Sequence, residues 1–263
     1  MRAAAGLACF VLLTGCEAAR SPATEVASPL TWGADIAEDF EALPRVAGDS
    51  PADRAINAFL DGLDDRDRES RSNCLTEGPE NAEWGRSVAA PMTGPRFVSI
   101  IVTRGDYCGG AHPDWSETHY TFDLLTGTHV DWAALLPVEM SARMHEPDYS
   151  WPATLASPSL TAWFAQRALA SLDRRGQETC ASTYGPEGRG SLRLGVWLDA
   201  KENGLGLQLM PSHHAEIACV TFLTIPAADL RRRGVSAELV DAIETAHRER
   251  LWRERRPESE AKP

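Results

Sequence analysis

The stretch FVSIIVTRGDYCGGAHPDWSETHYTFDLLTG, residues 97–127, contains two strand patterns joined by a loop. In residues 97–103, apolar and β-branched side chains occupy both faces, which predicts a strand at the centre of a sheet. In residues 119–124, polar and apolar side chains alternate. This alternation predicts one buried face and one more solvated face, with His119 and Asp123 on the solvated side.

The connecting loop, YCGGAHPDW, carries reactive side chains next to two glycines. Adjacent glycines directly after a strand supply positive φ or allow another backbone to approach closely, and we assign this role to Gly109 and Gly110. His112 precedes a proline, which favours an extended conformation, and its ring is expected to hydrogen-bond the loop backbone. We interpret the loop as a structural bend whose candidate binding residues are Gly109, Gly110, His112 and Trp115.

Other chemistry remains open for this region. The bare amides of the two glycines are suited to an anion. A cell-wall hydrolase would use His112, Asp114 and Asp123 as its catalytic residues. A metal site would join His112 to residues from both halves of the chain: His119, Asp123, His213 and His214. However, no zinc-binding spacing, nucleophile elbow or phosphate-binding glycine pattern is present. The sequence therefore favours binding over catalysis, without a metal or a cofactor.

Four tryptophans are a candidate sugar-stacking surface, although such residues more often pack in the interior. They are Trp84, Trp115, Trp151 and Trp197. Among them, Trp197 alternates with leucine and valine in a strand pattern and is expected to point outward.

Local capping rules place the helices and one hairpin. Ser50-Pro51 and Ser157-Pro158 each predict a helix start, and Ser236 predicts the cap of a last helix. We expect Asp64 of the first helix to face water, and the second helix to close at Gly176. Asn203-Gly204 predicts a tight hairpin turn, and a final strand is expected over residues 219–225. The strands are grouped apart from the helices, which predicts an α+β fold with a largely antiparallel sheet.

The chain begins with MRAAAGLACFVLLTGC, a basic residue followed by an apolar run too short for a permanent membrane span. The ending Leu-Thr-Gly-Cys is similar to the lipobox of bacterial lipoproteins, and this resemblance implies lipidation of Cys16. We expect four segments: a signal peptide (1–15), a lipidated flexible tether (16–48), a globular domain (49–255) and a disordered tail (256–263). Glu17 favours the outer membrane, so the expected location is the periplasmic side of the cell envelope.

The formal net charge of −12 argues against nucleic acid as a partner, because such a surface repels phosphate backbones. The same charge attracts a cationic protein. Contact with a membrane is expected through the lipid anchor alone.

Four cysteines remain after the signal peptide and the lipidated position, in a chain destined for an oxidising compartment: Cys74, Cys108, Cys180 and Cys219. Two disulfides are the natural interpretation, with three connectivities open. We favour Cys74–Cys108 and Cys180–Cys219, because each pair lies in one half of the chain. A zinc site is disfavoured, since no two of these cysteines have the short spacing of structural zinc ligands.

The motif Gly-Gly-Ala-His at residues 109–112, followed by an aromatic-alternating strand that ends in Asp-Leu-Leu-Thr-Gly, resembles the RsiV-like extracellular domain family. A later stretch, residues 202–230, is similar to the second half of that family's domain; it reads ENGLGLQLMPSHHAEIACVTFLTIPAADL. The resemblance covers residues 51–230. The family is a domain of unknown function that occurs in lysozyme-binding anti-sigma factors and beside peptidoglycan deacetylase domains.

The resemblance implies a non-catalytic domain that binds a lysozyme-like protein or peptidoglycan. A role in sigma-factor sequestration is not expected, because the chain shows no sigma-binding segment. The alternative function is a hydrolase or deacetylase-associated enzyme that acts on the cell wall through the GGAHP loop.

Overall fold

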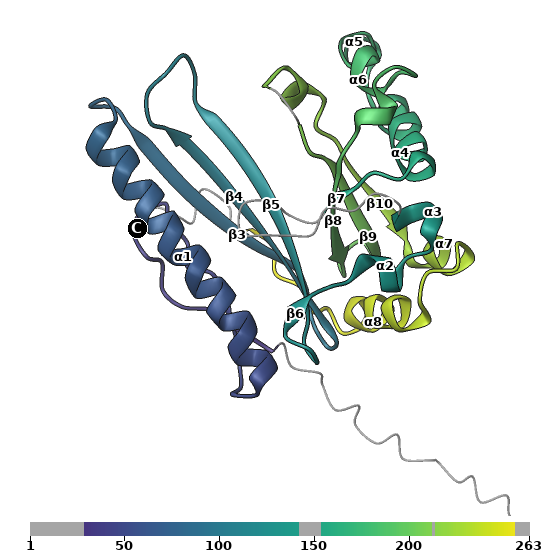
Figure 1. Cartoon of the computed structure of the whole chain (residues 1–263), viewed down its shortest axis with the longest axis horizontal. Coiled ribbons are helices and arrows are strands. Elements are labelled where there is room, and N and C mark those ends of the chain that lie inside the picture. Colours follow the sequence, from purple (N-terminus) through teal and green to yellow (C-terminus); the bar gives the residue numbers. More distant parts are fainter. Residues whose placement is uncertain (1–28, 142–153, 212–213, 256–263) are drawn as a thin grey trace, which may run out of the picture.

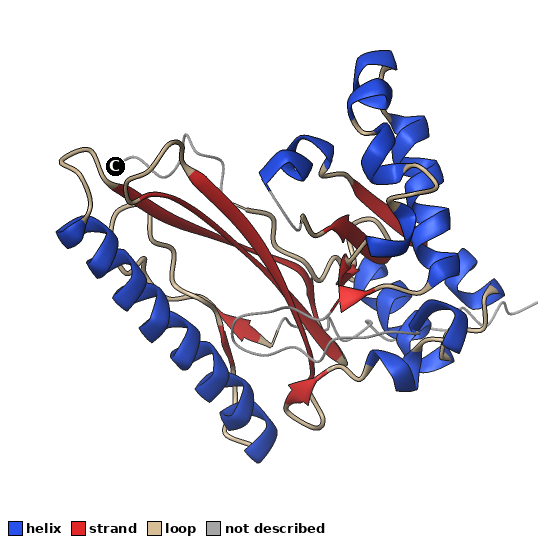
Figure 2. Ribbon diagram, turned by 45° about the horizontal axis from the view of Figure 1, so that its top comes forward, coloured by secondary structure: helices blue, strands red, loops and turns tan. Residues whose placement is uncertain are grey.

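The computed structural model describes residues 29–141, 154–211 and 214–255. In this part of the chain, α1 covers the outer face of one antiparallel sheet, and a second antiparallel sheet packs on the inner face (Figures 1 and 2). Most of the other helices lie beyond the second sheet. The predicted α+β class with antiparallel pairing is confirmed, with the strands divided between two main sheets.

The sheets and helices have the following bounds. The first sheet has the order β3 (Glu83–Thr93), β4 (Phe97–Tyr107), β5 (Asp114–Asp123) and β6 (Thr128–His129). The second has the order β10 (Phe222–Pro226), β9 (Gly204–Leu209), β8 (Leu194–Asp199) and β7 (Thr154–Leu155). A two-stranded sheet pairs β1 (Leu30–Thr31) with β2 (Arg45–Val46). The helices are α1 (Pro51–Glu77), α2 (Trp132–Leu135), α3 (Val138–Ser141), α4 (Pro158–Ser171), α5 (Arg174–Thr179), α6 (Ala181–Tyr184), α7 (Ala227–Arg232) and α8 (Ala237–Arg248), with short 3-10 turns η1 (Arg189–Ser191) and η2 (His214–Cys219).

Helix α1 starts where the sequence predicts. The Ser50 hydroxyl accepts a hydrogen bond from the Asp53 amide at 3.1 Å, and the Asp53 carboxylate accepts one from the Ser50 amide at 3.0 Å. This reciprocal pair satisfies two amides that have no partner within the helix. The buried side chains Ile56, Leu60 and Leu63 then pack against the first sheet.

Beyond Leu63, the contact between α1 and the first sheet becomes ionic. Arg86 of β3 donates hydrogen bonds to Asp64 and, at 2.6 Å, to Asp67. Arg104 of β4 binds Asp67 through two nitrogens, at 2.7 and 2.9 Å. We call these four residues the ionic layer. The expectation that Asp64 faces water is wrong, because its carboxylate is the counter-charge of a fully buried arginine.

The inner face of the first sheet is polar and is covered by the second sheet. The Ser99 hydroxyl bonds Thr121 at 2.8 Å and accepts a hydrogen bond from the Leu198 amide of β8 at 2.9 Å. His119 and Thr121 are buried. The prediction that His119 lies on a solvated face is therefore wrong, because β8 crosses β3, β4 and β5 on that side.

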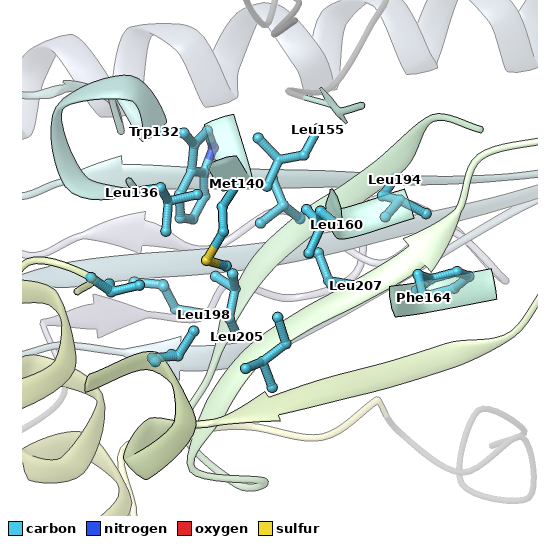
Figure 3. Packing of buried hydrophobic residues seen from close by; sticks show 14 of the residues in the cluster. Trp132, Leu136, Met140, Leu155, Leu160, Phe164, Leu194, Leu198, Leu205 and Leu207 are labelled. Carbon is cyan, nitrogen blue, oxygen red and sulfur yellow. The ribbon is translucent and has the colours of Figure 1, made fainter. Parts of the chain in front are cut away.

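The larger hydrophobic core lies between the second sheet and its helices (Figure 3). Leu194, Leu198, Leu205 and Leu207 line the sheet side of this core, and Phe164 of α4 lies among them. Apolar side chains therefore sit on one face of β8 and β9, while the other face carries the contacts to the first sheet.

Several predicted boundaries hold and others shift. Ser157 caps α4 and Asn203 occupies the hairpin turn with φ 50°, as predicted. Helix α4 ends at Ser171 and Gly176 lies inside α5, because Asp173 starts a new helix by capping the Gly176 amide. The last strand starts at Phe222, and Cys219 ends the preceding 3-10 turn. Ser236 precedes α8 without a side-chain cap.

Both predicted disulfides are confirmed. Cys74 at the end of α1 is bonded to Cys108 after β4, and Cys180 after α5 is bonded to Cys219. Each bond joins segments on the same side of the boundary between the two sheets. Within the described residues, no helix is both long and apolar enough to cross a membrane.

The folded part starts before residue 49. Leu30, Phe40 and Leu43 are buried, so the second half of the predicted tether packs on the domain, while its first half lies outside the described residues, as do Cys16 and the predicted tail. At the other end of the chain, residues 251–253 form a strap along β3. Arg253 pairs with Ala90, and the Leu251 carbonyl accepts a hydrogen bond from the Thr93 amide at 2.8 Å.

We predict that Asp67→Ala lowers the free energy of unfolding by about 3–5 kcal/mol, because two arginines in the interior lose their shared carboxylate. The matched control is Asp65→Ala on the same helix, whose exposed pair with Arg68 contributes less than about 1 kcal/mol. Urea unfolding followed by circular dichroism measures both values. Equal losses in the two variants would contradict a stabilising ionic layer.

Candidate functional site

The glycine loop is a bend at the end of the β4–β5 hairpin. Gly109 and Gly110 have φ of 103° and 118°, values that L side chains rarely adopt. Directly before them, Cys108 is fixed to α1 by its disulfide. The loop conformation is therefore set by backbone geometry and by a covalent bond.

His112 is exposed at the outside of this bend. Its Nδ1 lies 3.1 Å from the carbonyl oxygen of Pro113, so the ring hydrogen-bonds neighbouring main chain in the tautomer with a proton on Nδ1. This contact has the predicted form. The same residue also lines a pocket with other polar side chains.

This loop pocket has a volume of about 580 Å³ and lies between the glycine loop and the end of the second sheet. Its lining residues are Asp106, Cys108, Gly109, Gly110, Ala111, His112, Asp114, Trp115, Pro211 and Ile217. All four predicted binding residues, Gly109, Gly110, His112 and Trp115, belong to it. No lysine or arginine is among these lining residues.

Two carboxylates face each other in the loop pocket. Asp106 and Asp114 are direct cross-strand partners on β4 and β5. Burial, together with the negative charge of Asp114, raises the pKa of Asp106 above its usual value. Like charges in this arrangement destabilise a sheet, and a cation placed between them would relieve the repulsion.

A buried network lies on the inner face of β5, deeper than Trp115. Glu117 bonds the Thr103 hydroxyl at 3.0 Å, His119 Nε2 at 3.2 Å and the Arg255 guanidinium at 3.1 Å. Burial by itself would raise the pKa of Glu117, but the hydrogen bond and charge of His119, with further help from Thr103 and Arg255, lower it. The His119 ring stacks on Trp197 with centroids 4.5 Å apart. These contacts join the two sheets.

Glycines of the second sheet make room for the two stacked rings. A Cβ at Gly206 would lie 2.0 Å from the Trp197 ring, and one at Gly195 would lie 2.6 Å from His119 Nδ1. We expected Trp197 to point outward to solvent, and this is wrong. Its side chain points away from the apolar core but is buried in the interface between the two sheets. Trp84 is buried as well, Trp115 is partly buried in the loop pocket, and Trp151 lies outside the described residues.

The three residues of the hydrolase hypothesis do not come together. His112 and Asp114 lie at the loop, whereas Asp123 ends β5 at the opposite end of the strand, where it pairs with Arg96 at 2.7 Å. His119 lies between the sheets, His213 lies outside the described residues, and the side chain of His214 is not described. In the described ranges, no group of three His, Cys, Asp or Glu residues is placed to hold a metal ion.

His129 was not singled out by the sequence, yet it has the clearest pKa shift among the histidines whose side chains the structure describes. Its ring stacks on Phe122 with centroids 4.5 Å apart and meets Phe59 edge-on at 4.6 Å. Burial lowers the pKa of His129 from 6.5 to about 4, against a hydrogen bond to Thr121 that raises it. The ring is neutral in the folded protein near pH 7 and packs as an aromatic side chain.

We predict that His129 makes the fold less stable as the pH drops from 6.5 to about 4. In this range the unfolded chain binds a proton that the folded chain excludes. The free energy of unfolding therefore falls by up to about 1.4 kcal/mol for each unit by which the pH drops. Urea unfolding of the native protein and of His129→Phe across this range should give a flatter profile for the variant. Parallel profiles, or an imidazole that titrates near 6.5 by NMR, would contradict the prediction.

Comparison with known proteins finds similarity among solved structures. No protein-family model matches the chain. No curated protein matches it either. Among solved structures, it is similar to the crystal structure of a member of the DUF3298 family from Bacteroides fragilis NCTC 9343, at 14% identity and a TM-score of 0.40, with 75% of each chain covered.

Proposed function

We propose that the chain is a lipid-anchored protein of a bacterial cell envelope whose RsiV-like domain binds a cationic protein of lysozyme type, without catalysis. The observation that carries the proposal is the loop pocket. It presents two opposed carboxylates, Asp106 and Asp114, beside the partly buried ring of Trp115, and no cation among its lining residues offsets their charge.

The chemistry of the loop pocket suits a basic side chain of a partner. An arginine or lysine placed between Asp106 and Asp114 would form charge-assisted hydrogen bonds and remove the repulsion between them. Trp115 lines the same pocket from the opposite face of β5. The disulfide at Cys108 holds the loop in place, so binding orders few additional residues.

Two further properties support this function. The net charge of −12 speeds the encounter with a cationic protein, since long-range attraction raises association rates. The Gly-Gly-Ala-His motif, on which the family resemblance rests, supplies half of the lining of the pocket's loop side. The hydrolase alternative has lost its second carboxylate, because Asp123 lies at the far end of β5 from His112 and Asp114.

We predict that hen egg-white lysozyme binds the purified domain and that Asp114→Lys weakens this binding at least about ten-fold, a loss near 1.4 kcal/mol. Biolayer interferometry at about 50 mM and about 300 mM salt measures the affinity, which should fall as salt screens the charges. The matched control is Asp241→Lys, an exposed aspartate on α8 with the same change in charge.

Two outcomes would overturn the proposed partner. One is absence of lysozyme binding at low salt by a folded domain. The other is equal weakening by Asp114→Lys and Asp241→Lys, which would indicate a non-specific effect of net charge. Binding of purified peptidoglycan fragments in place of lysozyme would assign the pocket to the cell wall instead.

The anchor is tested separately. We predict that the full chain incorporates labelled palmitate and sediments with membranes, and that Cys16→Ser abolishes both, because this residue carries the acyl chains in the proposed lipoprotein. Cys9→Ser, a change within the same segment, should leave both unchanged. Membrane association of Cys16→Ser at the native level would remove the lipid anchor from the proposal.

A further inference from the structure

A second pocket opens between the C-terminal part of α1 and the first sheet. It also has a volume of about 580 Å³, and we call it the helix pocket. Arg71 and Leu75 line it from α1, while Trp84, Asp106 and Asp114 line it from β3, β4 and β5. Leu75 is 41% exposed, so its side chain is accessible from this pocket.

The helix pocket lies one row beyond the ionic layer. Arg86 and Arg104 are cross-strand partners, and two residues farther along each strand Trp84, Asp106 and Asp114 form the next row on the same face. On α1, Arg71 follows Asp67 by four residues and therefore lies on the same side of the helix. The two rows are thus successive layers of one interface.

The two layers carry opposite arrangements of charge. In the ionic layer the helix supplies carboxylates, the sheet supplies arginines, and every partner is in contact. In the next layer the helix supplies an arginine, the sheet supplies carboxylates, and a cavity separates them. The charges are complementary across the cavity, but the protein does not close it.

Arg71 is the residue of this pocket that lacks a partner for a buried polar atom. Its Nε atom is buried and has no hydrogen-bond partner, and no ion pair joins Arg71 to a carboxylate within the described residues. A buried donor without a partner is costly, and native proteins rarely leave one without a ligand, an ion or a water molecule. Asp106 and Asp114 likewise have no cationic partner in the described part of the chain.

We propose that the helix pocket binds a zwitterionic ligand of the amino-acid class, either a free amino acid or a short peptide. Arg71 receives the carboxylate, Asp106 and Asp114 receive the ammonium group, and the apolar part of the ligand rests against Leu75 and Trp84. A volume of about 580 Å³ is in the usual range for small-molecule sites and has room for a short peptide.

This site is distinct from the one proposed for a cationic protein. The pockets share Asp106 and Asp114, but Arg71 lines the helix pocket and is absent from the lining of the loop pocket. A partner that carries positive charge alone gains nothing from Arg71, whereas a zwitterion requires it. Substitution of Arg71 therefore separates the two proposals.

Isothermal titration calorimetry of the purified domain with L-alanine and with the tripeptide Ala-Ala-Ala tests the site. At least one of these probes should bind, and the N-acetylated and C-amidated forms of that probe should each bind at least about ten-fold more weakly, a change of about 1.4 kcal/mol. Saturation by both probes indicates that the free amino acid suffices, and saturation by the tripeptide alone indicates a peptide ligand.

Arg71→Gln should weaken binding of the zwitterionic probe at least about ten-fold while thermal unfolding stays close to that of the native protein. The matched control is Arg68→Gln, three residues earlier on α1, where the arginine is exposed and pairs with Asp65. The control should bind as the native protein does. Asp114→Asn should weaken the zwitterion and leave the residual affinity for the N-acetylated probe unchanged.

Three results would overturn the proposal. The first is that neither probe binds at millimolar concentration, and the second is that the acetylated and amidated probes bind as well as the zwitterion. The third is that Arg71→Gln binds the zwitterionic probe as tightly as Arg68→Gln does. Lysozyme binding by Arg71→Gln is a separate readout and should persist, so failure of this site does not affect the function proposed for the loop pocket.

Discussion

The buried contact between α1 and the first sheet is the constraint on which the rest of the structure depends. Two arginines that point inward from neighbouring strands can be accommodated only if carboxylates meet them, because an uncompensated buried charge is very costly. Asp64 and Asp67 therefore fix the rotation of α1 about its axis and its position along the strands. That position determines where the helix ends, and hence where Cys74 meets the loop and where Arg71 faces the sheet.

Local rules predicted much of the fold from the sequence. Capping at Ser50 and Ser157, the turn at Asn203 and the strand at residues 97–103 depend on near neighbours in the chain, and all are present. The burial of Asp64 and of His119 was missed for one common reason: their partners, Arg86 and Trp197, are far away in sequence. An alternating pattern shows which face is apolar, but it does not show that a second sheet covers the polar face.

The candidate site was also predictable from the sequence only in part. The glycine loop and both disulfides followed from composition and spacing, since each disulfide joins cysteines in one half of the chain. The facing of Asp106 and Asp114 depends on strand register, which the sequence of the loop alone does not fix. The environment of Arg71 depends on the sheet opposite α1, which the sequence of the helix alone does not show.

The strap of residues 251–253 has a consequence for the order of assembly. Strand β3 is the outermost strand of its sheet, and the backbone groups of Ala90 and Thr93 find partners in nearly the last residues that the structure describes. During synthesis these groups have no partner until residues 251–253 emerge, and an unprotected strand edge is a template for association between molecules. A chain without residues 251–253 would therefore expose a strand edge that these residues cover in the folded protein.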